Sequence, residues 1–275
     1  MEILFSLITA FCLGLHNAIA KKPLQTMSPS SLFFWREFLV VLLMLPIVIF
    51  FKPYIDFQDI IIQKNFAISL LAGFIGYFVV VFLYKGIQVG NPGLIGAISN
   101  SYLPGVMLLS FIFLGEALEL SFLPKAALIF VGILLISLPK GLKEKKNTKG
   151  IQYGIFAMLI YSVMFILYKP ATMVLGAIIA TFVMRFAGFL TVGAALKIKG
   201  KKFTFPKKEF KVVFILGFLM TITVFSLGFA LENSGNNLSL VVAIIGSNPL
   251  ITLIYSHFIY KMSITPKQLV GSLQR

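Results

Sequence analysis

Nine apolar runs, each long enough to cross a bilayer, constrain this chain more than any other feature of its sequence. A transmembrane helix needs roughly 17–25 mostly apolar residues. The runs lie at about 3–20, 31–51, 66–84, 93–114, 122–138, 151–168, 173–196, 212–231 and 238–260. Because a backbone in lipid must satisfy its own hydrogen bonds, and because the runs lack strict alternation, they predict helices and not barrel strands. The expected fold class is an all-α polytopic membrane helix bundle.

The charged residues lie mainly between these runs. Only 12% of the 275 residues are charged, against about 25% in soluble domains. The net charge of +15 gathers in short connectors such as 140–149 and 197–211, where basic residues set topology and contact anionic lipid headgroups. The expected partner of this charge is therefore the lipid bilayer and not nucleic acid. The single cysteine, Cys12, excludes an internal disulfide, and no motif for a cofactor or a metal is present.

The chain contains an internal repeat. Residues 84–116 align without a gap with residues 229–261, and in each segment a Gly-Asn pair precedes an apolar helix. A proline lies about half-way through each helix, Pro104 in the first and Pro249 in the second. The alignment predicts two related halves.

The boundaries of the halves follow from the runs. We expect a first repeat of five spans at 1–138, a basic linker at 139–149 and a second repeat at 150–275. An odd number of spans per repeat gives the two halves opposite orientations in the membrane, as in many transporters. The segment 265–273 resembles the start of a tenth helix, and about fifteen further apolar residues are expected by analogy with 122–138. The pattern is therefore one of ten spans with the tenth truncated.

These features resemble the EamA-domain members of the drug/metabolite transporter superfamily. The residues that carry the resemblance are Lys22-Pro23 followed by Arg36, the stretch from Ala97 to Pro104, and Leu114-Gly115-Glu116 before Pro124. The second half departs from the family pattern, because Lys261 stands where a glutamate is expected. The resemblance implies ten helices around a central cavity, and transport of amino acids, nucleotide sugars or other small metabolites, commonly as export. We expect a multi-pass protein of the bacterial plasma membrane.

Ionisable residues within the spans are candidate site residues, because each costs about 2.5–3.5 kcal/mol on insertion scales. Arg36 either snorkels, takes part in a structural ion pair or faces a substrate. The adjacent Glu37 is not expected to share its helical face. Arg185 lies deeper, with no acidic residue nearby in the sequence. It requires a wet cavity, backbone carbonyls, a partner on another helix or a substrate carboxylate.

Polar residues within the spans give further candidates. His16 and Asn17 form a polar pair near the end of the first run, beside Gly14. They either hydrogen-bond between helices or, through the histidine, relay a proton that serves as the coupling ion.

Two polar clusters precede the paired prolines, Ser99-Asn100 before Pro104 and Ser247-Asn248 before Pro249. A proline frees the carbonyl four residues earlier and bends its helix. Each cluster is expected to lie at a kink near mid-membrane depth, where it lines a substrate site or serves helix packing.

The combined features favour a secondary active transporter that exports small metabolites or amino acids by alternating access between two inverted repeats. Two alternatives are an intramembrane enzyme and a truncated homologue that acts as a scaffold. The sequence has no nucleotide-binding Gly-rich loop with Lys-Ser/Thr and no His-Glu-x-x-His pair. Alternate connectors hold most of the lysines, and lysine-rich connectors face the cytoplasm, which places the N-terminus outside. The resemblance instead implies a cytoplasmic N-terminus. Both orientations stay open.

Overall fold

The computed structural model describes residues 1–51, 58–115, 145–201, 203–234 and 238–260. All regular structure in these ranges is helical, as predicted. The elements are α1 (Glu2–Ala20), the 3-10 turn η1 (Pro23–Gln25), α2 (Pro29–Phe51), α3 (Ile60–Val89), α4 (Pro92–Ser99), α5 (Leu103–Leu114), α7 (Lys145–Ile198), α8 (Phe210–Glu232), α9 (Leu238–Ile245) and α10 (Asn248–Tyr260). The predicted span at 122–138 and the helix start at 265–273 lie outside the described residues, as does most of the predicted linker.

Six helices in the described part of the chain are long and apolar enough to cross a membrane. Their outward faces carry large apolar side chains, such as Leu7 and Phe11 on α1, Phe50 on α2 and Phe74 on α3. A water-soluble protein rarely exposes apolar surface on this scale, whereas lipid chains solvate it. The prediction of an all-α polytopic membrane bundle is therefore confirmed.

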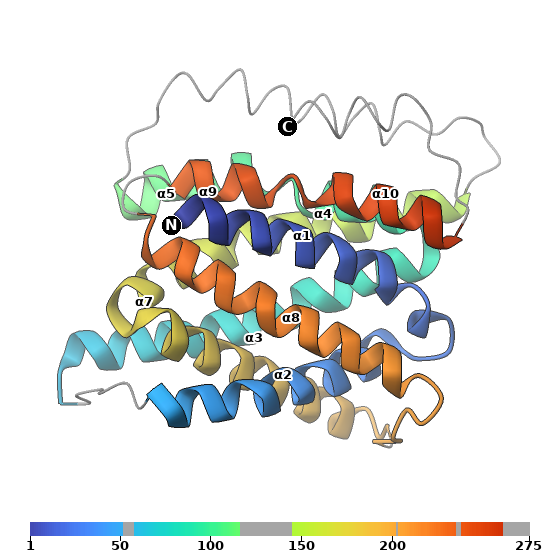
Figure 1. Ribbon diagram of the computed structural model, residues 1–275, viewed down its shortest axis with the longest axis horizontal. Helices are drawn as coiled ribbons and strands as arrows, with labels where there is room; N and C mark the ends of the chain where they lie inside the picture. The colour runs from blue at the N-terminus through green and yellow to red at the C-terminus, as the bar shows by residue number, and fades with distance from the viewer. Residues whose placement is uncertain (52–57, 116–144, 202, 235–237, 261–275) are drawn as a thin grey trace.

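Helix α7 folds back on itself at Gly176. The hydroxyl groups of Tyr168 and Thr181 are hydrogen-bonded, although thirteen residues of straight helix would separate them by about 20 Å. Gly176 has φ 76° and ψ 156°, a conformation that is essentially restricted to glycine. The two arms of α7 thus correspond to the predicted spans at 151–168 and 173–196, and the ribbon turns between them (Figure 1).

In the sequence, the Lys-Pro pairs after the first and sixth apolar runs, Lys22-Pro23 and Lys169-Pro170, predict helix ends, and the second of these predictions is wrong. Pro170 lies inside the first arm of α7, and the backbone stays helical up to Gly176. A proline removes one backbone donor from a membrane helix. Nearby side chains and small changes in the backbone can then satisfy the carbonyl that loses its partner. The corresponding prediction for the first half is confirmed, because α1 ends at Ala20 and Pro23 begins η1.

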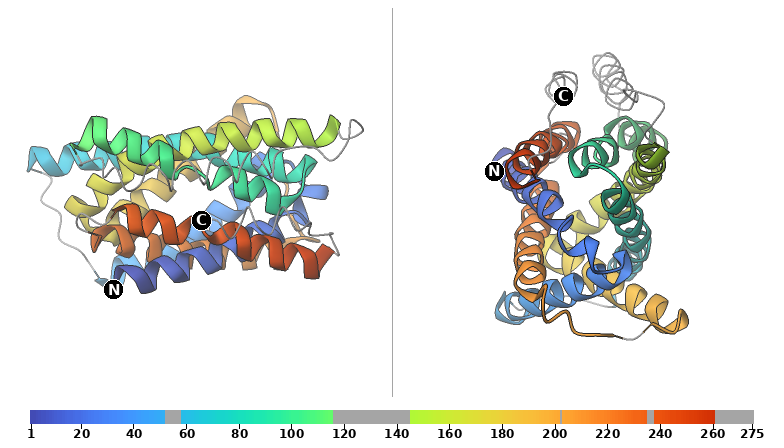
Figure 2. Two further views of the ribbon diagram at one scale, coloured as in Figure 1. Left: turned by 90° about the horizontal axis from the view of Figure 1, so that it is seen from above. Right: turned by 90° about the vertical axis from the view of Figure 1, so that its right-hand side faces the viewer.

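The predicted bends at the paired prolines are present and are complete breaks. The helix breaks between α4 and α5 just before Pro104, and between α9 and α10 just before Pro249. The carbonyl of Ile245 accepts a hydrogen bond of 2.8 Å from Asn248 Nδ2. Helix α4 packs against α10 and α5 against α9, so the two breaks lie close together. Figure 2 shows these four short helices along one side of the bundle.

Helix α1 packs closely against α10 and α8. A Cβ atom at Gly14 would lie 2.7 Å from the carbonyl oxygen of Asn248, so this glycine permits the close approach of α1 to α10. The hydroxyl of Thr252 donates to the Gly14 carbonyl at 3.0 Å. These contacts place the polar end of α1 beside the α9–α10 break.

Candidate functional site

The bundle contains a small, partly open cavity of about 40 Å³. Its lining comes from α1, α2, α3, the α4–α5 break, both arms of α7, α8 and the end of α9. The polar residues of the lining are Thr9, His16, Asn17, Arg36, Asn100, Tyr102, Tyr161, Arg185 and Thr223. The cavity therefore joins side chains from both halves of the chain.

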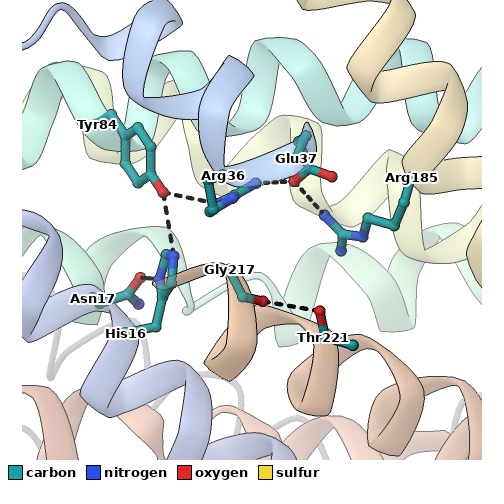
Figure 3. A network of polar contacts seen from close by, with 8 residues as sticks. All are labelled: His16, Asn17, Arg36, Glu37, Tyr84, Arg185, Gly217 and Thr221. Carbon is teal, nitrogen blue, oxygen red and sulfur yellow. Dashed lines mark hydrogen bonds and ion pairs between the residues drawn. The ribbon is translucent and has the colours of Figure 1, made fainter. Parts of the chain in front are cut away.

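A chain of hydrogen bonds runs along one side of this cavity (Figure 3). Arg36 Nη1 donates to Tyr84 OH at 2.8 Å, and Tyr84 OH lies 3.2 Å from His16 Nε2. Because a guanidinium only donates, the tyrosine proton is available for Nε2, and His16 then carries its own proton on Nδ1. Nδ1 lies 3.2 Å from Asn17 Oδ1. The hydrogen bonds thus point in one direction, from Arg36 to Asn17, and suit a neutral imidazole.

One carboxylate oxygen connects the two arginines of the site. Glu37 Oε1 accepts from Arg36 Nη2 and, at 3.3 Å, from Arg185 Nη1 (Figure 3). The side chains of Arg36 and Glu37 are 1% and 0% exposed, and that of Arg185 is 14% exposed. Two guanidinium groups against one carboxylate leave a net charge of +1 inside the bundle.

The expectation that Arg36 and Glu37 do not pair is wrong. Successive helical residues point in different directions, but the long arginine side chain reaches round to its neighbour's carboxylate. Its guanidinium also lies 4.7 Å from the ring centre of Phe33 and 5.5 Å from that of Tyr84, within the range of cation–π attraction. Burial of Arg36 excludes snorkelling, and the structure shows both ion pairing and a place in the cavity wall.

Several buried polar atoms around the cavity have no hydrogen-bond partner within the described protein. Among the lining residues, the donors are Asn17 Nδ2, Arg36 Nε and Arg185 Nε, and the acceptor is Asn100 Oδ1. Two further acceptors, Glu37 Oε2 and Asn248 Oδ1, belong to buried residues outside the lining. The Asn100 amide orientation is fixed, because its Nδ2 donates to Gly96 O at 2.7 Å. A buried unsatisfied polar group costs about 1–3 kcal/mol. The concentration of such groups at one place marks the cavity as a site for a polar ligand or water.

The structure brings together most of the site residues predicted from the sequence. Five of them line the cavity: His16, Asn17, Arg36, Asn100 and Arg185. The other three, Ser99, Ser247 and Asn248, are not among the lining residues. Ser99 is buried at the end of α4 and Asn248 at the α9–α10 break. The Ser247 hydroxyl donates to Ile244 O at 2.7 Å.

Sequence reasoning did not identify Glu37 or Tyr84 as site residues. Glu37 carried a usable signal, since it is an acidic residue inside a span of a chain with only nine acidic residues. Tyr84 carried none, because a tyrosine near the end of an apolar run is common. The described residues contain no group of three His, Cys, Asp or Glu side chains that could hold a metal ion.

Comparison with known proteins gives a family match over both halves of the chain. The EamA-like transporter family matches residues 1–138 and 148–273. Among solved structures, 28 chains match. One of them, described as "Crystal structure of protein", is 12% identical, covers 99% of this chain and 92% of its own, and has a TM-score of 0.67. That similarity shows a shared fold. A search of curated protein sequences gives no match.

Proposed function

This chain belongs to the EamA-like transporter family, whose members are generally transporters and not enzymes, and we propose that it is a secondary active exporter of small metabolites or amino acids. The observation that carries the proposal is the polar cavity inside the bundle with its excess positive charge. A bundle that served only as a scaffold would gain nothing from a buried net charge, which is costly in a low-dielectric interior.

The substrate site that we propose is this cavity. Its binding residues are Arg185 and Arg36 with His16, Asn17 and Asn100, and with Asn248, Ser99 and Ser247 at the adjoining helix breaks. Support comes from the unpaired polar atoms that surround the cavity. A ligand that supplies both acceptors and donors would satisfy them.

Transport by alternating access requires the cavity to open. At about 40 Å³ it has room for a few water molecules, whereas metabolite sites occupy about 300–1,000 Å³. We propose that the repeats 1–138 and 150–275 are inverted and rock about the cavity, exposing it to each side in turn. The two helix breaks support this idea, because a broken helix bends at its break without loss of further backbone hydrogen bonds.

The proposed location is the bacterial plasma membrane, with a proton as the coupling ion. The candidate proton carrier is His16, because it lies in the cavity wall and both of its ring nitrogens take part in the hydrogen-bond chain. The lysine-rich ends of α7 and α8 provide the contacts with anionic headgroups.

The test is export from vesicles that contain the purified chain, with a panel of metabolites and an imposed proton gradient. Arg185→Ala removes a charge-assisted interaction, which is typically about 1.5–3 kcal/mol, and we expect at least a tenfold loss of gradient-driven flux. Lys197→Ala is the matched control, because Lys197 is an exposed cation at the C-terminal end of the same helical arm. A stably inserted Arg185→Ala protein with wild-type flux, or a wild-type protein that moves no metabolite, would contradict the proposal.

A further inference from the structure

We infer that Glu37 is a built-in counter-anion that sets the charge of the ligand accepted at the Arg36–Arg185 pair to −1. The inference rests on the proposed function, since it concerns the same cavity. It makes Glu37 a specificity-determining residue and assigns the ligand to a chemical class, the compounds that carry one carboxylate and no other charge, which is narrower than the class named in the proposed function.

Among the described residues, these three charges form ion pairs with one another. Both arginines contact the same oxygen of Glu37, and neither has another carboxylate partner among the described residues. The remaining described acids that flank α8, Glu209 and Glu232, lie at its two ends, away from the cavity wall. Apart from the triad, no described charged side chain lines the cavity, so the charge that a ligand meets at its wall is that of the triad.

The sign and size of that charge select the ligand. With Glu37 ionised the triad carries +1, so a monoanion brings the site to neutrality. A neutral ligand leaves +1 and a dianion leaves −1, and either residual charge is disfavoured in an interior of low dielectric constant. Without Glu37 the same two arginines would carry +2 and would match a dianion.

The free edges of the guanidinium groups favour a carboxylate as the anionic group. Arg185 uses one Nη atom on Glu37, and its buried Nε has no partner within the described protein. Nε and an Nη atom form the fork that binds a carboxylate through two parallel hydrogen bonds. Arg185 is also the more exposed of the two arginines, at 14% against 1%. A ligand carboxylate thus joins at Arg185, while the hydrogen bonds to Tyr84 and Glu37 hold Arg36 in place.

The experiment compares three probes that share one carbon frame and differ in charge. Malonate, malonamate and malonamide carry two, one and no negative charges at neutral pH. Each is added at matched ionic strength to the full chain purified in detergent, and binding is measured as a shift of the thermal unfolding temperature. For the wild type we expect malonamate to bind at least tenfold more tightly than the other two.

Substitutions then change the triad charge one step at a time. Glu37→Gln raises it to +2, and malonate should become the preferred probe. Arg185→Gln lowers it to zero, and the advantage of the anions should disappear. The double variant Glu37→Gln/Arg185→Gln returns it to +1, and the preference should return to malonamate. A purely structural ion pair would instead lower the stability of every variant and leave the order of the probes unchanged.

A second variant covers the case in which Glu37→Gln does not fold. Glu37→Ala leaves space for a carboxylate, and formate should restore its thermal stability while the neutral isostere formamide should not. An unchanged probe order in all variants, or no response to any probe and no rescue by formate, would overturn the inference. Binding is measured without a gradient and so does not depend on transport. If the three probes bind in the expected order but the protein moves no metabolite, the proposed function is contradicted and the inference about Glu37 is not.

Discussion

The hydroxyl of Tyr84 connects the charged and the neutral parts of the site. It accepts from Arg36 and faces His16, and Tyr84 itself is fully buried. Tyr84→Phe would remove one group and leave two buried polar atoms without their partner. We expect a loss of about 1–3 kcal/mol, seen as a lower thermal unfolding temperature of the purified protein.

The matched control for this prediction is Tyr255→Phe. Tyr255 packs edge-on against Phe11 and is not part of the hydrogen-bond chain. It should leave the unfolding temperature nearly unchanged. Equal effects of the two substitutions would show that the Tyr84 hydroxyl makes no special contribution.

At the residue scale, sequence reasoning succeeds where a residue type is costly in a membrane. Arg36, Arg185 and His16 stand out because each is rare within an apolar run, and all three line the cavity. It fails where the three-dimensional path of a side chain decides the outcome. The pairing of Arg36 with Glu37 depends on the reach of a flexible side chain. The pairing of Glu37 with Arg185 depends on contact between α2 and α7, because the two residues are 148 positions apart in the sequence.

At the element scale, Gly176 determines where α7 reverses direction. An L-residue with a side chain adopts φ 76°, ψ 156° only at a cost of about 1–3 kcal/mol. Gly176→Ala should therefore lower the thermal unfolding temperature. Gly193→Ala is the control in the same helix, because a Cβ there makes only an ordinary contact of 3.6 Å with Phe34. If Gly193→Ala is the more damaging change, the reversal does not depend on glycine.

The helix breaks show how far local sequence rules reach. Pro104 and Pro249 predicted two bends, and both sites are breaks. The same reasoning placed a helix end at Pro170, where the structure has none. A proline disrupts a helix to an extent set by its neighbours, whereas the backbone conformation at Gly176 is open to few residues other than glycine. The sequence alone does not show which of two nearby breaking residues prevails.

At the scale of the whole molecule, the cavity of about 40 Å³ is too small for a metabolite, so a transport cycle must widen it. A metabolite can enter only if the helices around the cavity move. This movement can be measured by cysteine labelling, because Cys12 is the single cysteine of the sequence and Cys12→Ser yields a cysteine-free chain. A single cysteine introduced as Thr223→Cys would lie in the cavity wall. Lys208→Cys, at an exposed position before α8, supplies a reference that faces one side of the membrane.

Alternating access predicts that a membrane-impermeant thiol reagent reaches the cavity cysteine from either side, but not from both sides at once. An imposed proton gradient or a transported metabolite should raise the labelling rate from one side and lower it from the other by similar factors. The Lys208→Cys reference should react from one side at a rate that neither condition alters. Labelling of the cavity cysteine from a single side, at a constant rate, would instead describe a bundle with a fixed entrance. Such a bundle would bind a ligand at the arginine pair without carrying it across.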